Sequence, residues 1–280
     1  MIVKYENGQL NLVSENDIVK DPYCVAKGKN GKNYVVIDSV TNNLLNVSEG
    51  NSKTGEKCIN FNMSIEYTCN HSCECYKNAT CYACSGCYLF SSNQAKYTEN
   101  YKFFLENNNS VFIAALQLAI DTTGYKFFRY FTCGDIPNKN FIDCMVTLAK
   151  NNPDVMFWSY TKKYGLVNAW IDENGMLPEN LVIVFSHWMN NDGSFFPMNN
   201  KYNMPTSEFI PYGQEEKAKT VTHICPCSDP SANVTCLTCD HACYTLKPGE
   251  NMALLEHSTK QTKERDKAIH AAKKALPKKQ

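Results

Sequence analysis

The chain has 280 residues with 28 basic and 28 acidic side chains, and 43% of its residues are hydrophobic. This length and composition predict a globular protein of one or two domains with a sizeable core. They exclude generic disorder and a small scaffold held together by disulfides. The apolar runs are far shorter than the about 18 residues that a membrane span requires, so we expect no span.

Fifteen cysteines are the most unusual feature of the composition. The amino terminus, Met1-Ile-Val-Lys-Tyr-Glu-Asn, has no basic segment followed by a long apolar core, so it shows no secretory signal and a cytoplasmic location is expected. In a reducing compartment, clustered thiols indicate metal or redox chemistry more often than disulfides.

The first part of the chain is predicted to be rich in β-structure. Residues 1–57 combine short β-type runs, such as 34–38, with Asn-Gly and Gly-Lys-Asn-Gly turns. Residues 59–67 alternate apolar and polar residues as a half-buried strand does, and they lead into a cysteine-dense loop at 69–87. A helical pattern follows over about 94–122.

Strand and helix patterns then alternate along the chain. Strands are predicted at 127–132, 155–160 and 181–186, and helices at 139–150 and 161–173. This order favours parallel βαβ units and therefore an α/β fold, either a partial (β/α) barrel or an open parallel sheet. Residues 187–220 are predicted to form a long connection.

Three parts follow from these patterns: a β-rich lead-in at 1–57, an α/β metal-binding domain at 58–250 and a basic helical or disordered tail at 251–280. From Ser258 to Gln280 the tail carries eight basic residues against two acidic ones. Such a segment can neutralise phosphates, so nucleic acid is a predicted partner. The alternative is a solvated, frayed terminus.

The first cysteine cluster has six thiols: Cys69, Cys73, Cys75, Cys81, Cys84 and Cys87. Its last three thiols have C-x2-C-x2-C spacing, which suits thiolates that wrap one iron–sulfur cluster. His71 lies inside this cluster and is an alternative ligand.

The second cysteine cluster has five thiols: Cys225, Cys227, Cys236, Cys239 and Cys243. A C-x-C pair with a C-x2-C pair supplies the four thiolates of a closed tetrahedral zinc site, with His241 as an alternative ligand. We predict that at least one cluster binds metal, and both zinc and iron–sulfur stay open. Cys24, Cys58 and Cys144 are isolated and expected to be structural.

Several segments together resemble the phage gene product 88 family, which is encoded by bacteriophages and by bacterial genomes carrying phage-derived genes. The matching pieces are Cys81-Tyr-Ala, Arg129-Tyr-Phe-Thr-Cys-Gly-Asp135, Phe157-Trp-Ser-Tyr-Thr-Lys162, the segment 177–186 and the closing cysteines of the second cluster. The resemblance covers about 60–245. It implies a phage-type protein in a bacterial host cell, but no particular reaction.

A weaker resemblance is to radical S-adenosylmethionine enzymes, in which a cysteine loop follows the first barrel strand and a Gly-Gly-Glu-like turn after the second strand binds the cofactor. Here the turn would be Cys133-Gly134-Asp135. The resemblance implies that this turn binds S-adenosylmethionine. Cys75 departs from that family's cysteine spacing.

The carboxyl ends of parallel strands collect ligands, so Asp135, Lys162 and His187 are expected near the first cluster. Asp135 and Lys162 are the candidate catalytic residues. The alternatives are an Asx cap for Asp135 and a surface cation for Lys162.

The sequence thus predicts a metal-binding protein with cysteine-ligated iron–sulfur or zinc centres. If it is an enzyme, the second resemblance implies a radical-type iron–sulfur enzyme with a pocket at the strand ends. The alternative is a non-enzymatic zinc protein that binds nucleic acid in phage replication or regulation. A third hypothesis is an inhibitor of a host enzyme.

Overall fold

The computed structural model describes residues 44–256 and four strands in the preceding residues. The gaps within 44–256 are 52, 71–72, 78–80, 85, 191, 212, 221–222 and 229–232. The basic segment 258–280 and His71 lie outside the described residues, as does the side chain of Cys24. No described helix is both long enough and apolar enough to cross a membrane.

The described strands form one open, mixed sheet in the order β11-β12-β10-β9-β8-β7-β6-β5-β4-β3-β1-β2. The antiparallel part comprises β1 (Ile2–Glu6), β2 (Gln9–Val13), β3 (Tyr23–Lys27), β4 (Asn33–Asp38) and β5 (Leu44–Glu49). The parallel part comprises β6 (Ile59–Phe61), β7 (Phe127–Tyr130), β8 (Met156–Thr161), β9 (Leu181–Trp188), β10 (Thr206–Ile210), β12 (Asn251–Leu255) and β11 (His223–Ile224). The predicted α/β fold is confirmed in its open-sheet form.

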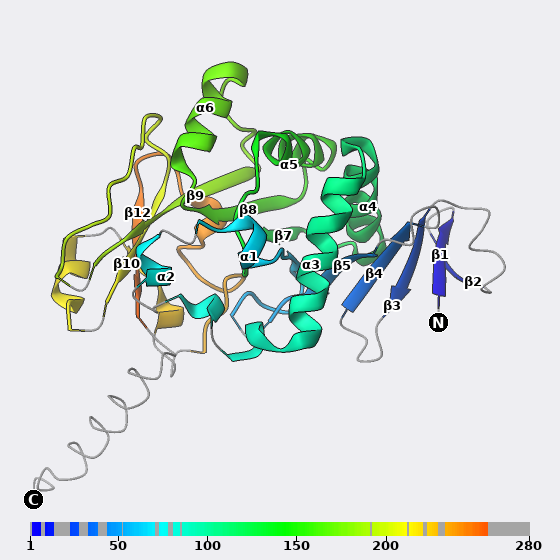
Figure 1. The fold of residues 1–280 in the computed structure, drawn as a ribbon, viewed down its shortest axis with the longest axis horizontal. Helices are drawn as coiled ribbons and strands as arrows, with labels where there is room; N and C mark the ends of the chain where they lie inside the picture. Colours follow the sequence, from blue (N-terminus) through cyan, green and yellow to red (C-terminus); the bar gives the residue numbers. More distant parts are fainter. Residues whose placement is uncertain are drawn as a thin grey trace, which may run out of the picture.

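The helices lie between the parallel strands in the chain. They are α1 (Ile65–Thr68), α2 (Glu74–Lys77), α3 (Ser91–Glu106), α4 (Asn109–Thr123), α5 (Lys139–Asn151) and α6 (Tyr164–Asn174). Single turns of 3-10 helix include η2 (Tyr82–Cys84), η3 (Gly86–Leu89), η4 (Glu215–Thr220), η5 (Pro226–Ser228) and η6 (Cys243–Thr245). Figure 1 shows β1 and β2 at one end of the sheet and β10 and β12 at the other.

The two faces of the parallel sheet are covered by different parts of the chain, because successive residues of a strand point to opposite faces. On one face, Phe128, Phe157 and Ile183 pack in one core with buried residues of α3 to α6. On the other face, Trp158 and Val184 pack against the carboxyl-terminal cysteine segment, which includes the buried Cys243 and Leu246.

Several boundaries differ from the sequence prediction. The strand expected at 59–67 ends at Phe61, because the Ser64 side chain accepts a hydrogen bond from the Glu66 N–H and caps α1. The helix expected at 94–122 is two helices, because Asn108 caps α4 through the Val111 N–H. The connection expected at 187–220 contains β10, and residues 251–255 form β12 instead of part of the tail.

Candidate metal centres

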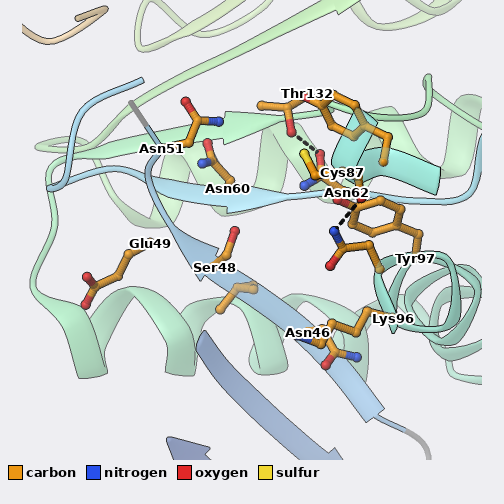
Figure 2. A pocket seen from close by; sticks show the side chains of 13 residues that line it. Asn46, Ser48, Glu49, Asn51, Asn60, Asn62, Cys87, Lys96, Tyr97 and Thr132 are labelled. Atoms are coloured by element: carbon orange, nitrogen blue, oxygen red, sulfur yellow. Dashed lines mark hydrogen bonds between the residues drawn. The ribbon is translucent and has the colours of Figure 1, made fainter. Parts of the chain in front are cut away.

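The loops that follow β6 and β7 are joined by one buried carboxamide. Asn62 Oδ1 accepts a hydrogen bond from the Thr132 hydroxyl at 2.8 Å (Figure 2). It also accepts one from the Cys133 N–H at 2.9 Å. The Met63 N–H donates to the Cys133 carbonyl at 3.2 Å. These bonds hold Cys133 against the segment that leads into the first cysteine cluster.

Gly134 allows this close approach of the two loops. Its φ is +98°, and a Cβ at this position would lie 2.6 Å from the Met63 carbonyl oxygen and 3.0 Å from Thr68 Oγ1. The next residue, Asp135, donates its N–H to the same Thr68 hydroxyl at 3.1 Å. Only glycine fits at this position, because the backbone has a positive φ and because a side chain would have no room between the two loops.

The Asp135 carboxylate connects the β7 loop to the end of β8. Its Oδ1 accepts from the Ile136 N–H at 2.7 Å and from the Thr161 hydroxyl at 2.6 Å. Its Oδ2 accepts from the Lys162 N–H at 3.1 Å. Burial raises the pKa of Asp135, while these hydrogen bonds act in the opposite direction. The hydrogen bond from the Ile136 N–H is of the kind expected for the Asx-cap alternative. The hydrogen bonds from the Thr161 hydroxyl and the Lys162 N–H hold the backbone of Lys162 in place at the end of β8.

Three thiols of the first cluster are packed together. The Sγ atoms of Cys73 and Cys75 are 3.1 Å apart, and Cys81 packs in the same small core beside Trp188. The Cys75 thiol hydrogen-bonds to both neighbouring thiols. These bonds lower the pKa of Cys73 and of Cys81 to about 6 and raise that of Cys75, so the group favours two thiolates bridged by one thiol.

Three further thiols lie close to this group. Burial raises the pKa of Cys69 above its usual range and that of Cys133 to about 12, and in both cases Cys81 adds to the increase. The pKa of Cys84 rises to about 11 from burial and from Cys81. Cys133 was predicted to belong to a cofactor-binding turn but not to lie near the cysteine cluster, where the fold places it. Its position directly after a predicted strand is the sequence feature that could have indicated this, because strand ends gather at one edge of a parallel sheet.

Lys162 brings a positive charge to the first cluster. Its Nζ lies 4.3 Å from the centroid of the Trp188 ring. Burial disfavours its charge, but Cys75, Asp135 and Cys73 together raise its pKa above the usual value. It is therefore half-buried among acidic groups instead of being a surface cation.

His187 was expected near the first cluster, but its neighbour Trp188 occupies that position. Adjacent residues of β9 point to opposite faces, so only one of the two can face the thiols. His187 instead stacks on Phe195, with ring centroids 4.2 Å apart.

The thiols of the second cluster also face one another. Cys225, Cys236 and Cys243 pack in the core on the face opposite the helices. Burial raises the pKa of Cys225 to about 12, and the nearby Cys227, Cys236 and Cys239 add to this shift. The thiols of the C-x-C and C-x2-C pairs are thus neighbours, as their spacing predicts.

A loop from the first part of the chain packs against this cluster. The Lys53 carbonyl accepts from the Cys236 N–H at 2.7 Å, and Lys53 Nζ donates to the Cys227 carbonyl at 2.8 Å. Cys58, which was expected to be structural, is buried and packs in the same core as Cys236. Cys144 lies instead in the core under the helices. His241 stacks on His223 with ring centroids 3.8 Å apart.

The strongest electrostatic influences on the thiols differ between the two clusters. Those on Cys73 and Cys81 come from thiols of the first cluster and from Lys162, and those on Cys236 come from Arg129 and from thiols of the second cluster. Arg129 is half-buried and lies over the Tyr160 ring. Among the described residues, no group of three or more Cys, His, Asp or Glu side chains already stands in a metal-holding arrangement.

The comparisons with known proteins give a family and nothing further. A family model described as Gene product 88 matches residues 36–204, more than half of the chain. The match begins earlier than expected, within the lead-in, and it leaves out the second cluster. No curated protein and no solved structure matches the chain, and the resemblance to radical S-adenosylmethionine enzymes is not supported. The extent of the family match shows that the chain belongs to the gene product 88 family.

Proposed function

We propose that this protein binds metal at both cysteine clusters, with an iron–sulfur cluster at the first and a structural zinc ion at the second. The packing of Cys73, Cys75 and Cys81 beside Lys162 carries the proposal. These residues belong to the loop after β6 and to the end of β8, so the fold assembles the site from distant segments.

The chemistry of the first cluster fits a metal centre. Thiolates are the metal-binding form of cysteine, and the pKa of both Cys73 and Cys81 is lowered to about 6. Two thiolates on one tetrahedral metal lie about 3.8 Å apart, close to the 3.1 Å between Cys73 and Cys75. A single rotamer change moves a cysteine Sγ by about 3 Å, which is enough to bring neighbouring thiols to a common metal.

The number and position of the thiols favour iron–sulfur at the first cluster. Six cysteines, with Cys133 beside them, are more than one four-thiolate site of either kind uses, and the C-x2-C-x2-C spacing of Cys81, Cys84 and Cys87 is the feature that favours iron–sulfur. A four-cysteine iron–sulfur cluster is anionic overall, and Lys162 supplies a compensating positive charge. The site also lies at the carboxyl ends of parallel strands, where α/β proteins bind their ligands. Lys162 therefore remains the candidate catalytic group, with Asp135 positioning it.

The second cluster favours zinc. Its two cysteine pairs supply four thiolates, and the segment joins the loop around Lys53 to the sheet. A closed metal site here would hold this segment as a cover over Trp158, on the face of the sheet opposite α3 to α6. This is the structural role that such four-thiolate zinc sites perform.

Metal analysis of protein purified without oxygen tests the proposal. We expect a coloured protein that contains iron, acid-labile sulfide and zinc. Changing Cys73 and Cys81 to Ser should remove iron and sulfide but keep zinc, and changing Cys225 and Cys239 to Ser should do the reverse. A Cys144→Ala variant is the matched control and should keep both.

A colourless protein that holds only zinc would overturn the iron–sulfur proposal and favour the non-enzymatic alternative. A protein that holds neither metal after growth with both supplied would overturn metal binding altogether. Loss of both metals from each double variant would contradict two independent centres.

A further inference from the structure

Arg129 is a cation on the face of the sheet that the second cysteine segment covers. Its neighbours in β7, Phe128 and Tyr130, point into the core under the helices, so the side chain between them points to the opposite face. Its guanidinium carbon lies 5.2 Å from the centroid of the Tyr160 ring. Tyr160 packs in one core with Cys236, so Arg129 faces the second cysteine segment.

The guanidinium has no anionic partner among the described residues. Its Nε atom is buried without a hydrogen-bond partner there, and no carboxylate in that part of the chain is within ion-pair distance of it. The nearby tyrosines are neutral at neutral pH, because burial raises the pKa of Tyr82, Tyr88 and Tyr160 further above the usual value of about 10. Arginine is always charged, and a half-buried charge without a counter-charge is costly.

The thiols of the second cluster can supply the missing negative charge. Burial raises the pKa of Cys236, and Arg129 is the strongest influence that lowers it. A free thiol is largely protonated at neutral pH, whereas a metal-bound cysteine is a thiolate. Four thiolates around one zinc ion carry a net charge of about −2. Metal binding therefore provides the counter-charge that Arg129 lacks.

A second donor lies beside Arg129 on the same face. Trp158 is its register partner in β8, and the Trp158 indole N–H is also buried without a hydrogen-bond partner in the described part of the chain. Trp158 packs against Cys243 and has Cys236 in the same core. Two unpartnered N–H donors thus adjoin the sulfur atoms of the second cluster.

We propose that Arg129 is the charge partner of the metal-bound thiolates of the second cluster and donates its Nε–H to one of them. The inference rests on the proposed zinc site and names a residue that stabilises the site without being a ligand. Arg129 acts through the sulfur ligands and is therefore a positioning residue. Zinc binding to four thiols makes the site more negative by about two charges, so a neighbouring cation favours it.

Zinc affinity of the full-length protein is the first test. Arg129→Met keeps the length of the side chain but removes its charge and its N–H donor. We expect it to bind zinc about tenfold to a hundredfold more weakly in competition with a chelator, the usual effect of losing a group that supports a metal ligand. Arg129→Lys keeps the charge and should recover most of the affinity. Lys126→Met, at an exposed position directly before β7, is the matched control and should change nothing.

Unfolding with and without bound zinc separates this role from a purely structural one. With zinc bound, Arg129→Met should lower the unfolding midpoint, because the thiolates lose their charge partner. After removal of zinc with a chelator, the same substitution should leave the midpoint unchanged or raise it, because an unpaired half-buried cation has been removed. An equal fall in both forms would overturn the inference, since it would show that Arg129 acts through packing on Tyr160.

Cobalt in place of zinc gives a readout that does not need a folded metal-free protein. The thiolate-to-cobalt charge-transfer band should move to longer wavelength in Arg129→Met, because electrons on uncompensated sulfur are easier to remove. It should stay in place in Lys126→Met. Equal zinc affinity and an unchanged band in Arg129→Met would overturn the inference alone. A complete lack of bound metal in the unaltered protein would overturn the proposed zinc site together with it.

Discussion

Lys162 Nζ lies 4.3 Å from the centroid of the Trp188 ring, beside the packed thiols of Cys73 and Cys75. The ammonium group is thus held between an aromatic face and a group of thiols. A cation gains from both neighbours, from the negative face of the indole and from the charge of the thiolates. This arrangement makes Lys162 the main electrostatic partner of the proposed first centre.

If the first centre is the proposed iron–sulfur cluster, replacing Lys162 with Met should lower its reduction potential. The neutral side chain keeps most of the packing but no longer stabilises the more negative, reduced form. A charge at this range in a partly buried site predicts a fall of roughly 60–120 mV. Potentiometric titration followed by electron paramagnetic resonance measures it. Lys162→Arg should keep most of the potential, and equal shifts in both variants would contradict the electrostatic role.

Replacing Gly134 with Ala should destabilise the protein strongly. The new Cβ would meet the Met63 carbonyl and force apart the two loops that bring Cys133 to the cluster. We expect a loss of about 2–4 kcal/mol in the free energy of unfolding. Denaturant unfolding measures it.

Gly124 is the matched control, since its φ is +65° but a Cβ there meets nothing within 4 Å. Gly124→Ala should cost only about 1 kcal/mol, from the backbone conformation alone. Equal losses in the two variants would show that the contact with Met63 is unimportant.

The stability of the protein should fall on acidification in a way that depends on His187. Burial lowers the pKa of His187 in the folded state, so the unfolded chain binds a proton more readily. The stability that neutral His187 contributes is complete above the unfolded pKa of about 6.5 and is lost as the pH falls through the folded value. His187→Phe keeps a ring to stack on Phe195 and should flatten the change between about pH 7.5 and pH 5.5. An unaltered slope in this variant would place the titrating group elsewhere.

Removing the proposed zinc ion should loosen the loop around Lys53 before it unfolds the core. The Cys236 N–H donates to the Lys53 carbonyl, so the order of this loop depends on the second cluster. Hydrogen exchange with and without a zinc chelator should show faster exchange at the Cys236 amide and little change at Phe157 in β8. Uniform acceleration across the sheet would contradict a local role for the metal.

The sequence predicted the βαβ part of the fold well, because each element there has its own signal. The α5 pattern is bounded by Asn138, which caps it, and by Pro153, which follows it. β10 and β12 were missed because they are short strands beside Asn-, Pro- and Gly-rich segments. Pairing completes them: β10 pairs with β9, and β12 pairs with β10. Tertiary pairing, not local composition, decides such strands.

The sequence predicted only those site residues that belong to a motif with a recognisable cysteine spacing. The two cysteine clusters were evident from their motifs, whereas the position of Cys133 depends on the parallel pairing of β6 with β7. Trp188, and not the predicted His187, contacts the first cluster. Adjacent residues of β9 point to opposite faces of the sheet, and the sequence does not show which face lies toward the thiols.

The chain has three tryptophans, and the fold gives each a different environment. Trp158 lies under the second cysteine segment and Trp188 beside the first cluster, while Trp170 packs with the helices and donates its indole N–H to Asp143 at 2.7 Å. Fluorescence from single-tryptophan variants would therefore report separately on each proposed metal centre. The variant that keeps only Trp170 would serve as the reference, so the loading of one centre could be followed while the other changes.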